Sequence, residues 1–357
     1  MLVDGVFVAS QSQPLSSSSS PASASAARDG LAGREPWRRA IRKLRRDRIA
    51  MGAGGVLLLI VLAALAAPLY ASLVAHTDPF HSGLDVKIMV DGRLVPVMQP
   101  SKIGLRLGVT PIGPTWQASY FLGADNQGRD VAARMFFGGR TSLLVAGAAT
   151  VICLTLAGLV GFVSGYWGGV VDMVLSHLLD ILWAFPVYLL AISLSIVLIS
   201  QTIVIGPFVI GSGSLLLPIL ILGVIFVPYV ARPIRGQVLT LRDSEFVLAS
   251  IGLGLPRWRI ILRDILPNII PTLLVFLPLM MALNIVTESA LSFLSIGVQP
   301  PGASWGTIIQ DGQALLYTRP AVSLAPGLAI VVTVIALNLF GEGVRDVLDP
   351  HTTLRSG

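Results

Sequence analysis

Long uncharged stretches constrain this chain more than any other feature of its sequence. Five strongly apolar stretches lack Asp, Glu, Lys and Arg, and they cover residues 49–75, 141–171, 181–231, 265–287 and 320–341. A helix of about 20 apolar residues is long enough to cross a bilayer. The third stretch is too long for one such helix but suits two, with a break near GPFVIGSGS, where Gly and Ser accumulate. The sequence therefore predicts an all-α polytopic membrane protein with six transmembrane helices.

The charge balance fits a membrane protein better than a nucleic-acid-binding protein. Charged residues make up 12% of the chain, against about 25% in soluble domains. The net charge of +6 comes from basic residues beside the apolar stretches, and no stacking aromatics interleave with them as single-stranded nucleic acid would require. Membrane lipid is the expected partner of the basic arm at 34–48, with a specific anionic partner as the alternative.

The basic arm also predicts orientation, because positive charge beside the first span favours a cytoplasmic N-terminus. With six spans, both termini and the Arg-rich loop after residue 231 are then cytoplasmic. The alternation of Val86, Ile88 and Val90 before Asp91-Gly92 predicts a β-hairpin outside the membrane. The expected segments are a disordered Ser-rich tail (1–33), the basic arm (34–48), the first span (49–75), an extracytoplasmic loop with the hairpin and an interfacial helix (76–140), a transmembrane domain (141–343) with a cytoplasmic loop at 232–267, and a cytoplasmic tail (344–357).

No common catalytic pattern is present. The chain lacks the G-x-x-x-x-G-K-[ST] phosphate-binding loop and the G-x-S-x-G and H-E-x-x-H patterns. Cys153 is the single cysteine, which excludes an intrachain disulfide. His177 and Asp180 are spaced to share a helix face, but a zinc site needs at least a third protein ligand. We therefore expect no enzymatic activity, and neither a metal nor a cofactor bound by this chain.

Few polar residues fall within the apolar stretches. Glu288 follows the stretch 265–287, and an ionisable group at membrane depth usually faces a bundle interior or a cavity. Two roles stay open for Glu288 and the nearby Asn284: lining a transport path or packing between helices. Gly161 and Gly165 repeat at a four-residue spacing that permits close helix packing.

The segment EFVLASIGLGLPRWRIILRDILPNIIP, residues 245–271, is basic and punctuated by Gly and Pro between two apolar stretches. Ser244 suits a helix N-cap, Gly252 and Gly254 suit a turn, and Pro256 suits the start of a second helix. The second helix is expected to show one apolar face, formed by Leu255, Trp258, Leu262 and Ile265. These residues alone leave two readings open: a helix pair lying on lipid, or a docking element for a cytoplasmic partner.

This segment resembles the coupling loop of binding-protein-dependent ABC importer permeases, whose "EAA" motif reads E-A-A-x-x-x-G and later I-x-L-P. Aligned on Gly254, the three motif positions fall on Leu248, Ala249 and Ser250, so the motif glutamate is absent. The peptide-transport branch often reads Y-V-x-A-[AS], which corresponds here to the sequence FVLAS at 246–250.

Four more segments resemble the dipeptide/oligopeptide branch of that family. They are FLGADNQGRDVAARMFFGGRTSLLVA (121–146), GYWGGVVDMVLSHLLDILWAFP (165–186), ALSFLSIGVQPPGASWGTII (290–309) and PGLAIVVTVIALNLFGEGVRDVLDP (326–350). The resemblance covers about residues 120–350, and its motifs stand in the family's order.

The resemblance implies a permease subunit in the plasma (inner) membrane that moves di- or oligopeptides by alternating access. It implies a paralogous permease, two ATPase subunits that carry ATP and Mg, and an extracytoplasmic substrate-binding protein as partners. The residues it assigns to ATPase coupling are Glu245, Phe246, Ala249, Ser250, Gly254, Trp258, Arg259 and Pro267. The alternatives are the same architecture for a nickel chelate, glutathione or another small solute, and a stand-alone secondary transporter or channel.

Overall fold

The computed structural model describes residues 42–101, 108–200, 203–205, 208–211 and 213–348. The expected Ser-rich tail (1–33), the first part of the basic arm (34–41) and the end of the C-terminal tail (349–357) lie outside the described residues.

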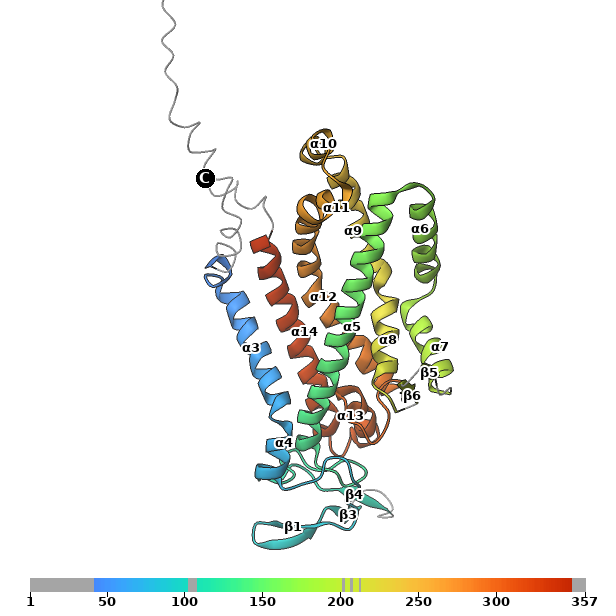
Figure 1. Ribbon diagram of the computed structural model, residues 1–357. Helices are drawn as coiled ribbons and strands as arrows, with labels where there is room; N and C mark the ends of the chain where they lie inside the picture. The colour runs from blue at the N-terminus through green and yellow to red at the C-terminus, as the bar shows by residue number, and fades with distance from the viewer. Residues whose placement is uncertain (1–41, 102–107, 201–202, 206–207, 212, 349–357) are drawn as a thin grey trace, which may run out of the picture.

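Long apolar helices dominate the described part of the chain (Figure 1). Four are long and apolar enough to cross a membrane: α3 (Arg48–Leu65), α5 (Val131–Trp167), the continuous segment of α11 (Arg257–Ile260), η3 (Ile261–Ile265) and α12 (Leu266–Phe293), and α14 (Ala321–Leu348). Two more candidates are bent pairs, α6 (Gly169–Ala184) with α7 (Val187–Ile199) at 90° and α8 (Leu216–Ile225) with α9 (Val227–Arg242) at 41°. Counting each bent pair as one span gives six, the predicted number, and confirms the all-α membrane fold.

Helix α5 occupies the centre of the bundle and packs against α3, α8, α9, α12 and α13 (Trp305–Gly312). It begins at Asp130, whose carboxylate accepts hydrogen bonds from the backbone N–H groups of Ala132 (2.8 Å) and Ala133 (3.2 Å). Gly161 and Gly165 lie where α5 approaches α9 most tightly: an added Cβ would fall 2.6 Å from the carbonyl oxygen of Ala231 or 2.7 Å from the Val238 Cβ. The two glycines therefore set the α5–α9 packing distance.

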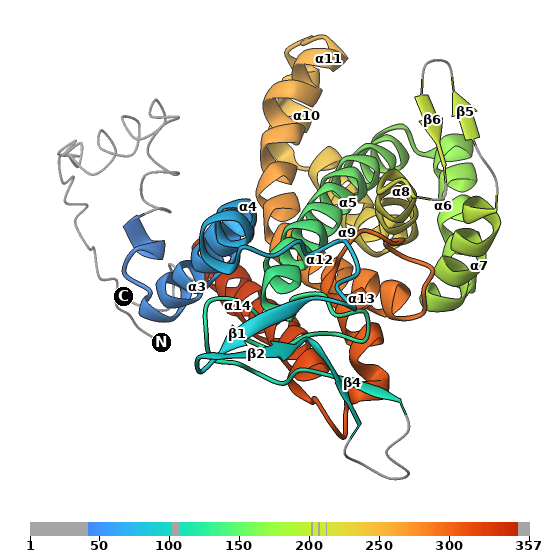
Figure 2. The ribbon, with the colours of Figure 1, turned by 90° about the horizontal axis from the view of Figure 1, so that it is seen from below.

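The predicted β-hairpin is confirmed as β1 (Lys87–Val90) paired antiparallel with β2 (Arg93–Pro96). Its turn residues, Asp91 and Gly92, have φ values of 49° and 76°, as a two-residue hairpin turn requires. A second hairpin that was not predicted pairs β3 (Met98–Pro100) with β4 (Val109–Pro111). Strands β1, β2 and β4 lie across one end of the bundle (Figure 2).

A third short hairpin, β5 (Ile203–Ile205) with β6 (Phe208–Ile210), lies in the GPFVIGSGS region, where the break between two spans was predicted. The α6–α7 pair therefore precedes this break and the α8–α9 pair follows it. The bend within α6–α7 falls at Phe185 and Pro186, because proline cannot continue a helix from the preceding turn.

The structure corrects two expectations about the loops. No separate interfacial helix lies in the described part of 76–130, and residues 131–140 are instead the first turns of α5, because Asp130 caps that helix. The cytoplasmic loop expected at 232–267 contains the two helices that were predicted, but it is shorter than expected at both ends: α9 runs on to Arg242, and the second helix continues directly into α12.

The prediction that the second helix of the 245–271 segment has a single apolar face is also wrong. Trp258 and Leu262 are exposed, whereas Ile260 and Ile265 are buried. The reason is the π-helical turn η3, which adds a residue to the turn and shifts the faces of the helix before and after it.

Candidate functional site

Helix α10 (Glu245–Gly252) stands at the end of the bundle opposite the strands (Figure 1). Its C-terminus is fixed by two hydrogen bonds, from the Gly254 N–H to the Ile251 carbonyl (2.9 Å) and from the Leu255 N–H to the Ser250 carbonyl (3.2 Å). This pair of bonds defines a Schellman turn, which needs a left-handed residue after the helix. Gly254 supplies it with φ +73°, whereas Gly252, also expected in the turn, remains within the helix.

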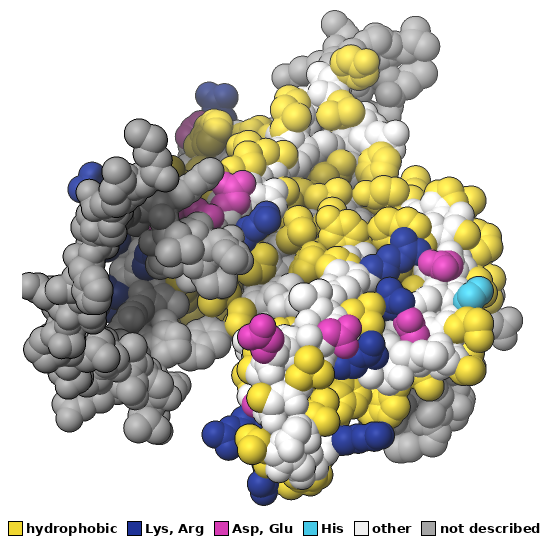
Figure 3. All heavy atoms as spheres, turned by 90° about the horizontal axis from the view of Figure 1, so that it is seen from above, with side chains coloured by type: hydrophobic (Ala, Val, Ile, Leu, Met, Phe, Trp, Pro, Cys, Tyr) yellow, Lys and Arg dark blue, Asp and Glu magenta, His cyan; other side chains and the backbone are white. Residues whose placement is uncertain are grey.

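The surface of α10 and the turn after it is apolar and largely uncovered. Val247 is 1% exposed and anchors the helix to the bundle, whereas Leu253 at the turn is 81% exposed. The exposed set comprises Phe246, Leu248, Ile251, Leu253 and Trp258. Figure 3 looks at the molecule from this end and shows hydrophobic side chains mixed with Lys and Arg. Clustered apolar exposure of this kind marks a surface for binding a protein or a membrane.

The structure brings most of the residues assigned to ATPase coupling together on α10, on the turn after it and on α11. Glu245, Phe246 and Ala249 are exposed on α10, Ser250 is half-buried there, and Gly254 forms the turn. Trp258 and Arg259 follow on α11, with the Arg259 guanidinium carbon 5.5 Å from the Trp258 ring centroid. Pro267 lies apart from them, exposed in the first turn of α12.

Arginines on α9, the helix that precedes α10, connect α9 to neighbouring helices, a feature that the sequence did not reveal. Arg235 forms a bidentate pair with Asp172 of α6, with Nε and Nη2 at 2.5 and 2.6 Å from the two carboxylate oxygens. Asp172 also accepts a hydrogen bond from Ser164 of α5. One turn before Arg235, Arg232 lies 2.6 Å from Asp180. Helices α5, α6 and α9 are therefore tied together, and α9 leads into α10.

Glu288 lies in the bundle interior on α12, where it is fully buried. Its carboxylate accepts hydrogen bonds from Ser142 of α5 (2.9 Å) and from Ser292 (2.7 Å). The Ser142 hydroxyl in turn accepts from the backbone N–H of Trp305 in α13 (3.2 Å). Glu288 therefore joins α5, α12 and α13, and Asn284 adds a further α12–α5 bond to Thr150 (2.9 Å).

Replacing Glu288 should separate its packing role from its charge. In Glu288→Gln the amide oxygen can still accept from one of the serine hydroxyls, so we expect a smaller loss of stability than in Glu288→Leu. In Glu288→Leu the buried hydroxyls lose their acceptor, which costs about 1–3 kcal/mol for each group left unsatisfied. Thermal unfolding of both variants in detergent micelles checks this expectation. Equal loss in the two variants would contradict a stabilising role for these hydrogen bonds.

A charged cluster lies at the opposite end of the bundle from α10, within the segment 121–146 that carries the family resemblance. Arg129 donates to Asp125 and to Asp311 of α13, both at 2.7 Å. Arg134 donates to the same Asp311 oxygen (2.9 Å) and to the carbonyl of Pro79 (3.0 Å). Burial raises the pKa of the Asp311 carboxyl, and the two guanidinium groups oppose that shift. The cluster therefore fixes the loop before α5 to α13.

His177 and Asp180 do not form a joint site. The His177 ring nitrogen Nδ1 lies 2.6 Å from the carbonyl oxygen of Met173, and Asp180 pairs with Arg232 instead. Across the described ranges, no three His, Cys, Asp or Glu side chains are grouped so that they could hold a metal ion.

The fold and its two ends define a class of protein: a polytopic helical membrane protein with an exposed apolar helix at one end and a charged cluster at the other. Residues 157–354 match the family of the binding-protein-dependent transport system inner membrane component. Residues 35–82 match the N-terminal transmembrane domain of oligopeptide transport permease C. This chain belongs to the family of binding-protein-dependent transport system inner membrane components, which confirms the resemblance read from the motifs.

Individual relatives are similar over most of their length. The oligopeptide transport system permease protein OppC of Haemophilus influenzae is 38% identical over 66% of this chain and 72% of its own. The dipeptide transport system permease protein DppC of Alkalihalophilus pseudofirmus is 31% identical over 88% and 90%, respectively. The glutathione transport system permease protein GsiD of Pectobacterium atrosepticum is 29% identical over 89% and 92%.

Proposed function

We propose that this chain is the permease subunit of an ATP-driven importer that moves peptides across the inner membrane by alternating access. The observation that carries the proposal is α10, a short helix with an uncovered apolar surface held on a rigid turn at one end of the bundle. The chain has no phosphate-binding loop of its own, so the energy of ATP has to reach it through such a surface. The names of the oligopeptide and dipeptide relatives support the substrate class.

In this proposal a separate ATPase subunit binds α10. When ATP and Mg bind to the ATPase subunit, that subunit moves α10. The Schellman turn transmits the displacement because Gly254 and Leu255 bond back to α10. Helix α9, which leads into α10, carries the displacement to α5 and α6 through the Arg235–Asp172 pair. Packed helices that are tied in this way move as one rigid body, as alternating access requires.

The Arg235–Asp172 pair gives a direct test of this transmission. Asp172→Arg places two guanidinium groups against each other, and we expect uptake to fall by about tenfold or more, which corresponds to about 1.4 kcal/mol. Arg235→Asp in the same chain restores an opposite-charge pair and should recover much of the uptake. ATP-driven uptake into vesicles is the measurement. Failure of the double variant to exceed Asp172→Arg would contradict a coupling role for the pair.

The proposed partners are a paralogous permease, two ATPase subunits and an extracytoplasmic substrate-binding protein.

The start of α3 and the end of α14 lie at the same end of the bundle as α10 (Figure 1). Arginines concentrate at this end, in residues 232–264, and positive charge favours the cytoplasmic side. We therefore propose that both termini and α10 are cytoplasmic and that the strands and α13 are extracytoplasmic.

The decisive experiment is purification of the tagged chain in mild detergent after expression with candidate partner subunits. Mass spectrometry identifies bound subunits, and reconstituted vesicles are offered labelled dipeptides, longer peptides, glutathione and a nickel chelate. Co-purification of a second permease and an ATPase, with ATP-dependent peptide uptake, is the expected result. ATP-dependent uptake of another solute but not of peptides would overturn the substrate class alone. Uptake by the isolated chain without ATP would overturn the importer assignment.

A further inference from the structure

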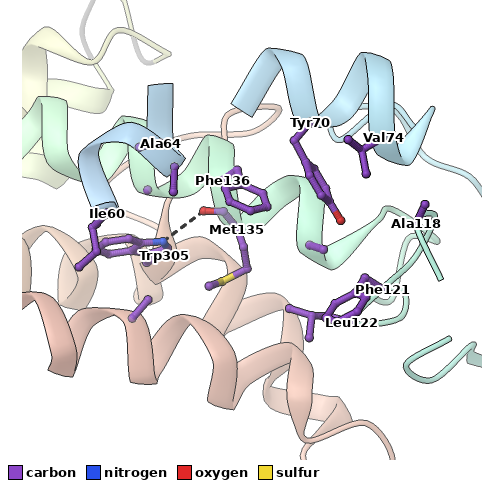
Figure 4. Close-up of a pocket in the computed structure, with 14 residues that line it drawn as sticks. Ile60, Ala64, Tyr70, Val74, Ala118, Phe121, Leu122, Met135, Phe136 and Trp305 are labelled. Atoms are coloured by element: carbon purple, nitrogen blue, oxygen red, sulfur yellow. Dashed lines mark hydrogen bonds between the residues drawn. The ribbon is translucent and has the colours of Figure 1, made fainter. Parts of the chain in front are cut away.

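An apolar cavity of about 490 Å³ lies beside the outer part of the bundle, at the end that carries the strands (Figure 4). Its walls come from α3, from the helical turns after it, from the loop before α5, and from α5, α13 and α14. Ala63 and Ala64 hollow the α3 wall, and Met135 and Gly139 of α5 also line the cavity. The volume falls within the range of about 300–1,000 Å³ that is usual for small-molecule sites.

The local structure explains why the cavity is present. Helix α3 ends at Leu65, and the chain continues through α4 (Ala67–Leu69) and the wide π-helical turn η2 (Tyr70–Ala75). The Trp305 ring forms part of the wall and is held by a hydrogen bond from its Nε1–H to the Met135 carbonyl (3.2 Å). Near η2 the Tyr70 and Phe136 rings are in contact, with centroids 4.5 Å apart. The walls are therefore fixed by contacts within the chain, and the cavity is preformed.

The surroundings of the cavity identify its occupant. The outward face of the same helical segment presents Leu65, Leu69 and Leu73, each more than half exposed, as a helix surrounded by hydrocarbon does. Val74 and Phe121 line the cavity and are themselves exposed, so the cavity is continuous with this surface. Water does not occupy an apolar cavity, and an empty one forfeits dispersion contacts along its walls. Hydrocarbon is the one medium at this depth that satisfies both conditions.

The end of the cavity near Val74 and Ala118 suits a lipid headgroup region. Trp116 is largely exposed there and packs edge-on against Phe121, with ring centroids 5.3 Å apart. Exposed Trp is enriched where the membrane meets water. The other end of the cavity reaches Ile60 on α3 and Ala329 on α14, inside two of the membrane-spanning helices. The cavity thus runs from the headgroup level into the bilayer.

We propose that this cavity binds one acyl chain of a phospholipid from the leaflet at the strand-bearing end. In this proposal the acyl chain lies between α3 and α5 and points toward Ile60, and the lipid headgroup lies beside Ala118 and Trp116. A bound acyl chain restores the dispersion contacts that an empty cavity forfeits, so the lipid stabilises the packing of α3 against α5. This site does not depend on the proposed function.

The test uses a phosphatidylethanolamine that carries a photoreactive diazirine in one acyl chain, mixed into vesicles that contain the full-length chain. Adducts mapped by mass spectrometry are expected on Ile60 and Met135, as well as on the outward-facing Leu59. Ala64→Phe places a ring in the cavity, and adducts on Met135 should then fall about tenfold, because the ring occupies the space of the acyl chain and takes over its contacts with the walls. Leu59→Phe is the matched control on the outer face of the same helix, and it should leave the Met135 adducts unchanged.

Adducts on Leu59 in the Ala64→Phe sample show that this variant is still inserted in the bilayer. Ala63→Phe is a second variant that fills the cavity from the neighbouring position on α3. Loss of the Met135 adducts in both filled variants, with outer-face adducts retained, supports the site. Labelling of Leu59 without Met135 in the unaltered chain would overturn it. So would Met135 labelling that persists in both filled variants.

Discussion

Gly254→Val is expected to abolish ATP-driven uptake while the chain still inserts into the membrane at the level of the unaltered protein. Gly254 has φ +73°, a conformation that costs an ordinary residue about 1–2 kcal/mol and that a β-branched residue rarely adopts. A Cβ at this position would meet no heavy atom within 4 Å. The effect therefore comes from the backbone of the turn and not from a steric clash.

The turn matters because it sets the direction of α10. With valine at position 254, the bonds from Gly254 and Leu255 back to Ile251 and Ser250 cannot both form in their present geometry. The exposed apolar surface around Leu253 then points elsewhere, and an ATPase subunit no longer binds it in the productive orientation. Uptake and ATP hydrolysis in reconstituted vesicles measure the loss, and the amount of chain in the membrane fraction measures insertion.

Two further variants make the expectation specific. Gly254→Asn should retain part of the uptake, because asparagine tolerates the left-handed region better than other residues. Gly252→Val is the matched control: Gly252 also has no heavy atom within 4 Å of an added Cβ, but it lies in the helix α10. Valine has a higher helix propensity than glycine, so this change should not weaken α10. Uptake by Gly254→Val equal to that of Gly252→Val would contradict the role of the turn.

The parts of the fold that follow from local pattern could be predicted from the sequence. Uncharged stretches give the spans because the bilayer fixes their length and composition. Alternation around Asp91-Gly92 gives the β1–β2 hairpin because that dipeptide accepts two positive φ values. Within the candidate site, the turn at Gly254 could also be predicted from local sequence, because a helix C-terminus often needs glycine.

The parts that depend on distant partners could not be predicted. Arg129 and Asp311 are 182 residues apart in the chain, and Arg235 and Asp172 are 63 apart. The sequence shows the charges but not which of them meet. The prediction of one apolar face on the second helix of the 245–271 segment was wrong for a different reason. An α-helical period was applied across Ile261–Ile265, where the structure has a π-helical turn.

Arg134→Met is expected to destabilise the protein more than the loss of any exposed ion pair. Arg134 is 1% exposed and donates to Asp311 and to the Pro79 carbonyl. Without it, Asp125 and Asp311 share only Arg129, and one negative charge in the buried cluster has no counterion. Removing one member of a buried ion pair costs about 3–5 kcal/mol. The difference in unfolding between variant and parent, followed by heat or denaturant in detergent micelles, measures the loss.

Arg232→Met is the matched control, because it deletes the same side chain from a pair in which both members are exposed. Pairs of that kind contribute about 0–1 kcal/mol. Asp311→Asn in the Arg134→Met background removes the unpaired charge and should recover part of the stability, since members of one network are not additive. Equal losses in Arg134→Met and Arg232→Met would show that the cluster does not behave as a buried network. If Asp311→Asn instead adds its full cost to that of Arg134→Met, then Arg134 acts through its contact with the Pro79 carbonyl and not through the shared carboxylate.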